Sequence, residues 1–88
     1  MASYRVFIKP SALKEIERMA KGDRQRVIRR IQALSSDPRP PGPEKLSGDD
    51  KYRIRQGDYR IVYSIADREQ EMVVIKVAHR NVVYRKLR

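Results

Sequence analysis

Cysteine is absent from the chain, and histidine occurs once, as His79. Without cysteine the protein cannot form disulfides, use a thiolate as nucleophile, or hold zinc or an iron–sulfur cluster through sulfur. A single histidine also excludes a metal site built from several histidines. We therefore expect neither a cysteine-based nor a multi-histidine metal site, and the composition is compatible with a reducing compartment.

Long hydrophobic runs are also missing. No apolar stretch approaches the ~20 residues that a bilayer-spanning helix needs. The N-terminal sequence MASYRVFIKPS lacks the apolar core of a signal peptide. We expect a soluble, cytoplasmic protein that makes no use of a membrane.

Acidic residues are scarce relative to basic ones. The 88 residues contain 21 Lys and Arg against 11 Asp and Glu, a formal charge of +10. A chain of this length predicts a single domain, residues 1–88. The charge favours a polyanionic partner, with nucleic acid ranked first, an acidic protein second and an anionic membrane third. Residues 51–88 hold ten basic and four acidic side chains, so we expect phosphate to bind in this half.

The first half of the chain predicts one strand and two helices. Residues 4–8 are aromatic and β-branched, and Pro10 follows them, which indicates a short strand. Apolar residues at helical spacing then predict a helix over 11–20, with Gly22 as its C-cap. Asp23 is expected to cap a second helix. The two apolar stripes are Leu13, Ile16, Met19 and Ala20 in the first helix and Val27, Ile28, Ile31 and Leu34 in the second.

In the second half of the chain, apolar residues recur at every second position. A proline-rich stretch, residues 37–44, predicts a stiff loop. Alternating residues from Lys51 onward, with turns at 56–58 and 66–70, predict a three-stranded antiparallel meander. We expect an α+β fold in which the N-terminal strand and the meander form a four-stranded sheet, with a helical hairpin covering one face.

Arginines occupy distinctive positions in this meander. Arg53 and Arg55 alternate with Tyr52 and Ile54, so they leave the strand on the side opposite to its apolar residues. Arg60 lies among apolar residues near the middle of the sheet. Burying a charge destabilises the folded protein unless the charge is paired or lines a water-filled cleft. The pattern therefore points to a cationic site on the sheet.

These residues also form a recognisable signature. It consists of Lys45-Leu46-x-Gly48, the runs YRIR at 52–55 and GDYRIVY at 57–63, then Val77-Ala78-His79-Arg80 and Val83-Tyr84-Arg85. Together they resemble the RelE family of toxins from toxin–antitoxin systems, and the resemblance covers nearly the whole chain.

The resemblance implies a RelE/ParE-like fold and a metal-independent endoribonuclease that cuts mRNA in the ribosomal A site and so inhibits translation. The reaction is attack of a ribose 2′-OH on the adjacent phosphate. The implied partners are the ribosome, with its mRNA and ribosomal RNA, and a cognate RelB-like antitoxin. We expect the antitoxin to be acidic, to fold on binding, and to form a hetero-oligomer with the toxin.

The resemblance also assigns roles to residues. Arg60 and Arg80 are expected to clamp the phosphate in the transition state, and Arg53 and Arg55, which replace two lysines of the best-known family member, to grip the scissile or neighbouring phosphates. Arginine stays protonated, so His79 or Tyr84 is left as the proton acceptor. Four further residues are expected to bind RNA: Lys45, Lys51, Lys76 and Arg85.

Two other functions stay open on the sequence. A ParE-like toxin would share the fold but bind and inhibit DNA gyrase without nuclease activity. An inactive relative acting as a binding partner is the third possibility. Joint retention of Arg60, Arg80 and Tyr84 favours the nuclease.

Overall fold

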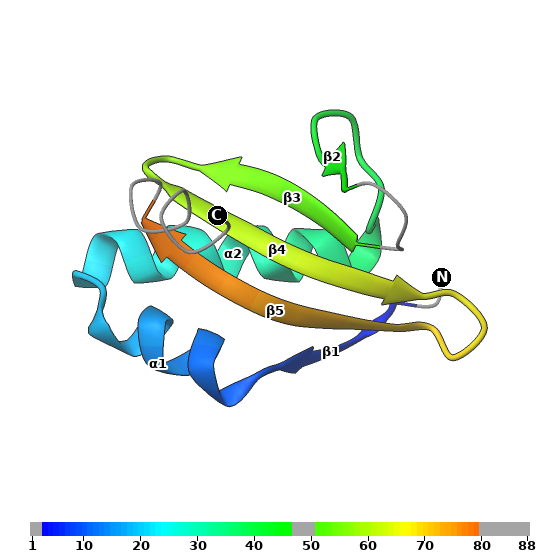
Figure 1. Cartoon of the computed structure of the whole chain (residues 1–88), viewed down its shortest axis with the longest axis horizontal. Coiled ribbons are helices and arrows are strands. Elements are labelled where there is room, and N and C mark those ends of the chain that lie inside the picture. The colour runs from blue at the N-terminus through cyan, green and yellow to red at the C-terminus, as the bar shows by residue number, and fades with distance from the viewer. Residues whose placement is uncertain (1–2, 47–50, 80–88) are drawn as a thin grey trace.

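The computed structural model of the protein describes residues 3–46 and 51–79. The elements follow the order β1 (Arg5–Ile8), α1 (Pro10–Arg18), α2 (Lys21–Ser36), β2 (Glu44–Lys45), β3 (Lys51–Gln56), β4 (Tyr59–Ala66) and β5 (Glu71–His79) (Figure 1). This confirms the predicted α+β class. No helix in the described part of the chain is long and apolar enough to cross a membrane.

The strands form one sheet in the order β1-β5-β4-β3-β2. The meander of β3, β4 and β5 is antiparallel, as predicted, and β1 adds to β5 in parallel. The sheet has five strands instead of four, because Glu44 and Lys45 of the proline-rich stretch pair with Arg53 and Tyr52 of β3.

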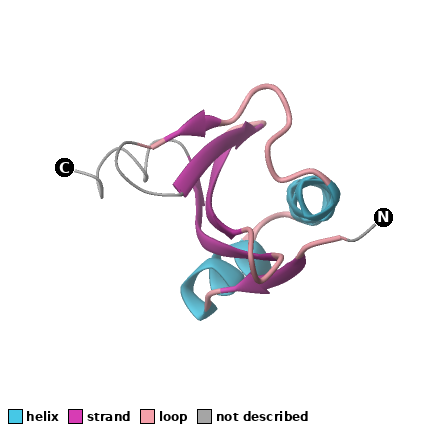
Figure 2. Ribbon diagram, turned by 90° about the vertical axis from the view of Figure 1, so that its right-hand side faces the viewer, coloured by secondary structure: helices cyan, strands magenta, loops and turns pink. Residues whose placement is uncertain are grey.

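One continuous apolar core lies between the helices and one face of the sheet (Figure 2). The sheet contributes the core residues Tyr52, Ile54, Ile61, Tyr63, Ile65, Met72, Val74 and Val77, and the helices contribute Ala12, Ile16, Met19, Val27, Ile31 and Leu34. The opposite face of the sheet has no helix on it in the described part of the chain (Figures 1 and 2). We call this the open face.

The helix ends differ from the sequence prediction. Gly22 does not cap the first helix, because α1 ends at Arg18 and Gly22 is already inside α2. Asp23 does not cap α2, whose N-cap is Ala20 and makes no side-chain hydrogen bond there. Asp23 instead lies in the first turn, where its carboxylate pairs with Arg26 at 3.3 Å and favours the positive end of the helix dipole.

The apolar stripes are correct at most positions. Ile16 and Met19 of the first stripe are buried, but Leu13 is 43% exposed and Ala20 is also exposed, while Ala12 is buried instead. In the second stripe Val27, Ile31 and Leu34 are buried, while Ile28 is 38% exposed. A helix of only nine residues buries a narrow face, so the stripe read from spacing alone is too wide.

A bulge in β5 decides which residues reach the core. Val62 pairs with Lys76 but Tyr63 pairs with Val74, so Ile75 is an extra residue in β5. The bulge lets Met72, Val74 and Val77 all face the core despite their uneven spacing. It also leaves Lys76 in register with Val62, on the open face.

Candidate functional site

Three arginines share the open face of the sheet. In β3, Arg53 and Arg55 alternate with the buried residues Tyr52 and Ile54. Arg60 of β4 pairs directly with Arg55 across the two strands, so their side chains leave the sheet on the same side. The parity argument made from the sequence for Arg53 and Arg55 is therefore correct, and the structure adds Arg60 to the same face.

These arginines line a pocket of about 330 Å³, together with Gly42 and Glu44. We call it the arginine pocket. The Glu44 carboxylate forms an ion pair with Arg53. Arg60 is only 6% exposed, although it carries a full charge. Like charges on opposed residues destabilise a sheet, so a pocket of this composition points to an anionic ligand.

The wall of the pocket is fixed by the loop between α2 and β2. Tyr63, fully buried in the core, donates a hydrogen bond from its hydroxyl to the Pro38 carbonyl oxygen at 2.8 Å. Its ring stacks on that of Tyr52, with centroids 5.7 Å apart. Burial raises the pKa of Tyr63 to about 12, so it stays a neutral hydrogen-bond donor. The start of the loop that carries Gly42 and Glu44 is thus anchored to the core.

Arg39 provides a second anchor for the same loop. Its two terminal nitrogens donate to both oxygens of Asp67, at 2.9 and 3.0 Å. Its Nε donates to the Tyr52 hydroxyl at 2.9 Å, and Tyr4 donates to Asp67 at 2.8 Å. Hydrogen bonds from Arg39 and Tyr4 hold the pKa of Asp67 below its usual value. Arg39 therefore stabilises the loop through Asp67 and Tyr52, and it does not line the arginine pocket.

His79 lies on the other side of the sheet from the arginine pocket. It pairs with Tyr59, and its neighbour Ala78 pairs with Arg60. Successive residues of a strand point to opposite faces, so His79 and Arg60 leave the sheet in opposite directions. Its ring meets that of Tyr59 edge to face, with centroids 5.6 Å apart. The structure does not bring His79 together with the arginines.

The predicted RNA-binding lysines divide between the two faces. Lys51 and Lys76 pair with Ser64 and Val62, which places both on the open face with the arginines. Lys45 pairs with Tyr52, so it leaves the short edge strand β2 on the opposite side. The remaining predicted site residues, Arg80, Tyr84 and Arg85, lie outside the described residues.

Glu44 and Gly42 are the pocket residues that sequence reasoning missed. Both lie in the stretch predicted to be a loop, where no alternation of apolar and polar residues indicates a strand. Glu44 reaches the pocket only because β2 pairs it with Arg53.

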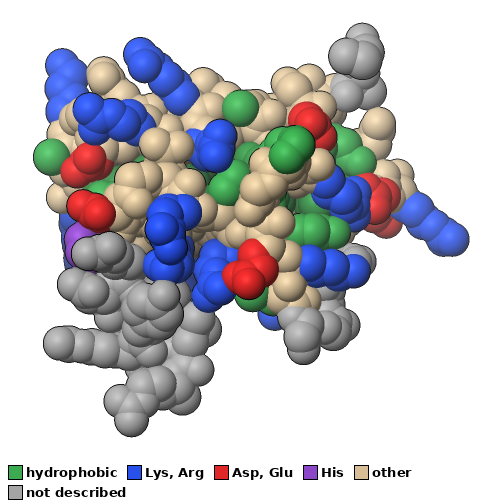
Figure 3. Space-filling model, turned by 90° about the horizontal axis from the view of Figure 1, so that it is seen from above, with side chains coloured by type: hydrophobic (Ala, Val, Ile, Leu, Met, Phe, Trp, Pro, Cys, Tyr) green, Lys and Arg blue, Asp and Glu red, His purple; other side chains and the backbone are tan. Residues whose placement is uncertain are grey.

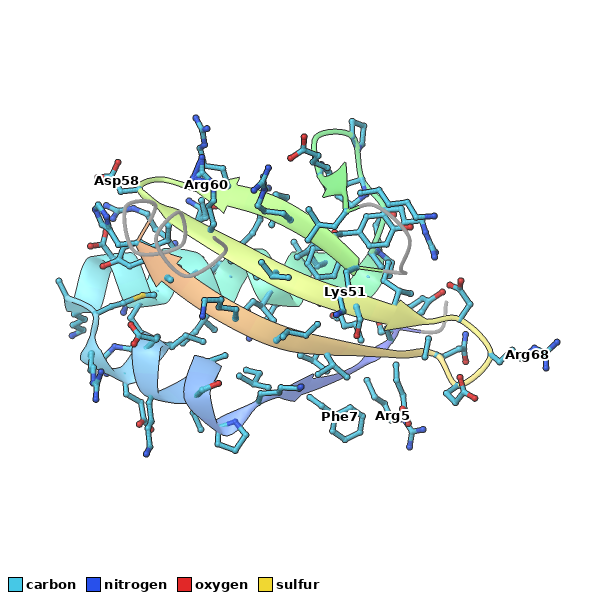
Figure 4. The ribbon with its side chains drawn as sticks, in the orientation of Figure 1. Arg5, Phe7, Lys51, Asp58, Arg60 and Arg68 are labelled. Atoms are coloured by element: carbon cyan, nitrogen blue, oxygen red, sulfur yellow. The ribbon has the colours of Figure 1, made fainter. Side chains whose placement is uncertain are left out.

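The geometry of the pocket suits phosphate. The planar guanidinium of arginine can donate two parallel hydrogen bonds to phosphate oxygens. Two arginines opposed across neighbouring strands, with a third two residues along, can surround one phosphodiester group. No cluster of three or more potential metal ligands occurs among residues 3–46 and 51–79. Arg60 lies at the end of the sheet remote from Arg68 (Figure 4).

Comparison with known proteins identifies the family. The model of the ParE toxin of type II toxin–antitoxin systems matches residues 6–84. A search of curated proteins finds no significant match. Among solved structures, the archaeal RelE–RelB complex from Pyrococcus horikoshii has 28% identity and a TM-score of 0.78, covering 90% of this chain and 97% of its own.

Two bacterial structures agree with this result. The isolated E. coli RelE toxin has 28% identity and a TM-score of 0.78, covering 97% of this chain and 95% of its own. The Mycobacterium tuberculosis RelBE2 toxin–antitoxin complex has 26% identity and a TM-score of 0.75, covering 91% and 94%. The chain therefore belongs to the ParE toxin family of type II toxin–antitoxin systems, within the RelE/ParE superfamily.

Proposed function

We propose that the protein is a metal-independent endoribonuclease that cuts mRNA in the ribosomal A site. The observation that carries the proposal is the arginine pocket, in which Arg53, Arg55 and Arg60 converge on one face of the sheet. Opposing Arg55 and Arg60 concentrates positive charge on this face, and an anionic ligand bound there would offset their repulsion. The similarity to RelE toxins agrees with this assignment.

The chemistry uses the charges of the pocket. The ribose 2′-oxygen attacks the adjacent phosphorus as its proton passes to a base, and the bond from phosphorus to the 5′-oxygen breaks. The products are a cyclic phosphate and a 5′-hydroxyl, whose proton comes from an acid or from water. Negative charge accumulates on the phosphate oxygens in the transition state, where arginine donors stabilise it most. Arg60, held in the sheet and nearly buried, is the best-fixed of these donors.

Proton transfer needs a group other than arginine, whose pKa lies above about 12. His79 lies on the opposite face from the pocket, which disfavours it as the base. We therefore propose Tyr84 as the proton acceptor, with Arg80 as a second clamp. Neighbouring arginines lower the pKa of a tyrosine by stabilising its phenolate. Placement of mRNA by the ribosome supplies a further part of the rate.

The test is primer extension on a defined mRNA in a reconstituted translation system, with the same RNA free of ribosomes in parallel. We expect cuts at the A-site codon only when ribosomes are present. Arg60→Gln and Arg55→Gln should each lower the cleavage rate at least about 100-fold, because each removes a charged donor to the transition state. Arg68→Gln is the matched control, since Arg68 is exposed in the turn between β4 and β5 (Figure 4). Equal activity in all four proteins would remove the pocket from the mechanism.

Inhibition of DNA gyrase is the second candidate function. The observation that favours it is the matched family model, which describes ParE toxins. The experiment is a supercoiling assay with purified gyrase. Inhibition of gyrase by a folded protein that cuts no mRNA would replace the nuclease proposal with this one.

We also propose that a cognate antitoxin binds the protein. Two of the three similar solved structures described above are toxin–antitoxin complexes. The formal charge of +10 favours an acidic partner segment and predicts fast, salt-sensitive association. Stopped-flow measurement at low and high salt tests this, and an association rate that does not change with salt would contradict the electrostatic argument.

A further inference from the structure

A second group of arginines lies on α2, away from the open face. Arg26, Arg29 and Arg30 line a pocket of about 280 Å³ together with Ala33 and with Gln56 at the end of β3. We call it the α2 pocket. None of the described residues that line it is acidic. The family resemblance assigns no role to any of them.

The charges of the α2 pocket are poorly compensated. Positions 26, 29 and 30 are three and four residues apart, so their side chains are neighbours on one side of the helix, where like charges destabilise it. Arg26 pairs with Asp23 at 3.3 Å. Arg30 is half-buried, and its Nε is shielded from solvent with no hydrogen-bond acceptor among the described residues. Such a donor is costly to leave unsatisfied, and the same side chain lines the α2 pocket.

The two pockets lie on opposite sides of the same strand end. Arg55 lines the arginine pocket and the next residue, Gln56, lines the α2 pocket. Their side chains point to opposite faces of the sheet. Strand β2 pairs with β3 at Arg53 and Tyr52, so among the described residues β3 is the edge of the sheet at Arg55 and Gln56. Figure 3 views the molecule from above, the side on which β2 and β3 lie in Figure 1, and shows Lys and Arg side chains spread over this surface.

We propose that the α2 pocket is a second phosphate-binding site, and that an RNA backbone passes around the β3 edge from the arginine pocket to the α2 pocket. A polyanion with regularly spaced phosphates can occupy both pockets at once, whereas a small anion can occupy only one. The bound RNA is the substrate class of the proposed nuclease, so the inference builds on the proposed function. Its evidence, the two pockets and the open edge, is nevertheless separate from the chemistry of cleavage.

The surroundings of the α2 pocket favour RNA over an acidic protein segment. A protein segment that folds on binding gains affinity from apolar anchors. The large apolar residue exposed on α2 is Ile28, which is about 200° around the helix from Arg26 and so lies away from the pocket. The pocket itself contains one small apolar residue, Ala33, and its other lining residues are arginines and a glutamine, which offer guanidinium and amide donors.

The experiment measures binding, without cleavage. The probes are 2′-O-methyl RNA of about a dozen nucleotides and a 2′-O-methyl dinucleotide, neither of which has a 2′-OH to react. Affinity is measured by fluorescence anisotropy over a range of salt concentrations. The test protein is Arg29→Gln/Arg30→Gln, and the control is Lys14→Gln/Arg18→Gln, which removes the same charge from the exposed surface of α1. Circular dichroism and thermal melting establish that both are folded.

We expect the α2 variant to bind the longer RNA about tenfold more weakly than the wild type at low salt, and its salt slope to fall by about 1.4, the value for two lost phosphate contacts on a single strand. Binding of the dinucleotide should change less than about twofold, because its single internucleotide phosphate can occupy only one of the two pockets. The α1 control should retain most of its affinity and its salt slope.

An equal loss of RNA affinity in the α1 and α2 variants would overturn the proposal, because the net charge of the protein would then explain binding. So would an unchanged RNA affinity combined with weaker binding of poly-glutamate, which would assign the pocket to an acidic protein. A failure of the proposed nuclease function can be distinguished from a failure of the second-site proposal. A wild-type protein that cuts no mRNA but shows the length-dependent α2 effect would refute the proposed function and retain the second site.

Discussion

Replacement of Tyr63 by phenylalanine tests how the loop beside the arginine pocket is held. Tyr63 is fully buried, and its hydroxyl donates to the Pro38 carbonyl at 2.8 Å. Phenylalanine keeps the ring and its stacking on Tyr52 but removes this donor. The Pro38 carbonyl then lies beside the core without its partner.

The expected cost follows from that contact. Removing one partner of a buried hydrogen bond costs about 1–3 kcal/mol. In a domain of this size each kcal/mol lowers the melting temperature by about 4–8 °C. We therefore expect Tyr63→Phe to melt about 5–20 °C below the wild type.

The assay is thermal and urea denaturation followed by circular dichroism. Tyr59→Phe is the matched control, because Tyr59 packs against the same core but its hydroxyl makes no hydrogen bond with a described residue. We expect the control to stay within about 0.5 kcal/mol of the wild type. If Tyr63→Phe were as stable as Tyr59→Phe, the Pro38 bond would not hold the loop.

Three further results are expected. Burial raises the pKa of Tyr63 to about 12, above its ordinary value of about 10, so its contribution is full below about pH 10 and is lost as pH rises toward 12. This pH dependence is measured by denaturing the wild type and Tyr63→Phe at several pH values in this range. An equal fall of the unfolding free energy in both proteins would show that Tyr63 is not its source. Arg55→Gln should raise the free energy of unfolding by about 0.2–1 kcal/mol at low salt by relieving repulsion from Arg60. A lower stability at low salt would contradict that reading. Glu44→Gln should bind non-cleavable RNA several-fold more tightly, because it releases Arg53 for phosphate. Weaker binding in the anisotropy assay would show that Glu44 supports the site.

Much of the candidate site could be predicted from alternation alone. A strand places successive side chains on opposite faces, so Tyr52 and Ile54 in the core fix Arg53 and Arg55 on the open face. The same rule and the turn at Gly57 put Arg60 opposite Arg55. These conclusions need only the local period and the hairpin register, and both are properties of neighbouring residues.

The helix termini were less predictable. Gly22 and Asp23 have the residue types of a C-cap and an N-cap, yet both lie within α2. The connection between α1 and α2 is tighter than those preferences suggest, because α2 begins at Lys21. Packing of Ile16, Met19 and Val27 into one core outweighs capping terms of about 1 kcal/mol.

The sequence by itself determined the α+β class, the antiparallel meander and the face on which the arginines lie, because each depends on a periodicity that neighbouring residues carry. Only the tertiary structure decided three other features. The bulge at Ile75 sets the register of β5, and with it the positions of Lys76 and His79. Pairing of β2 with β3 brings Glu44 to Arg53, and packing of α2 near Gln56 creates the α2 pocket. Each of these results from contact between segments distant in the chain, and no local pattern of residues encodes such a contact.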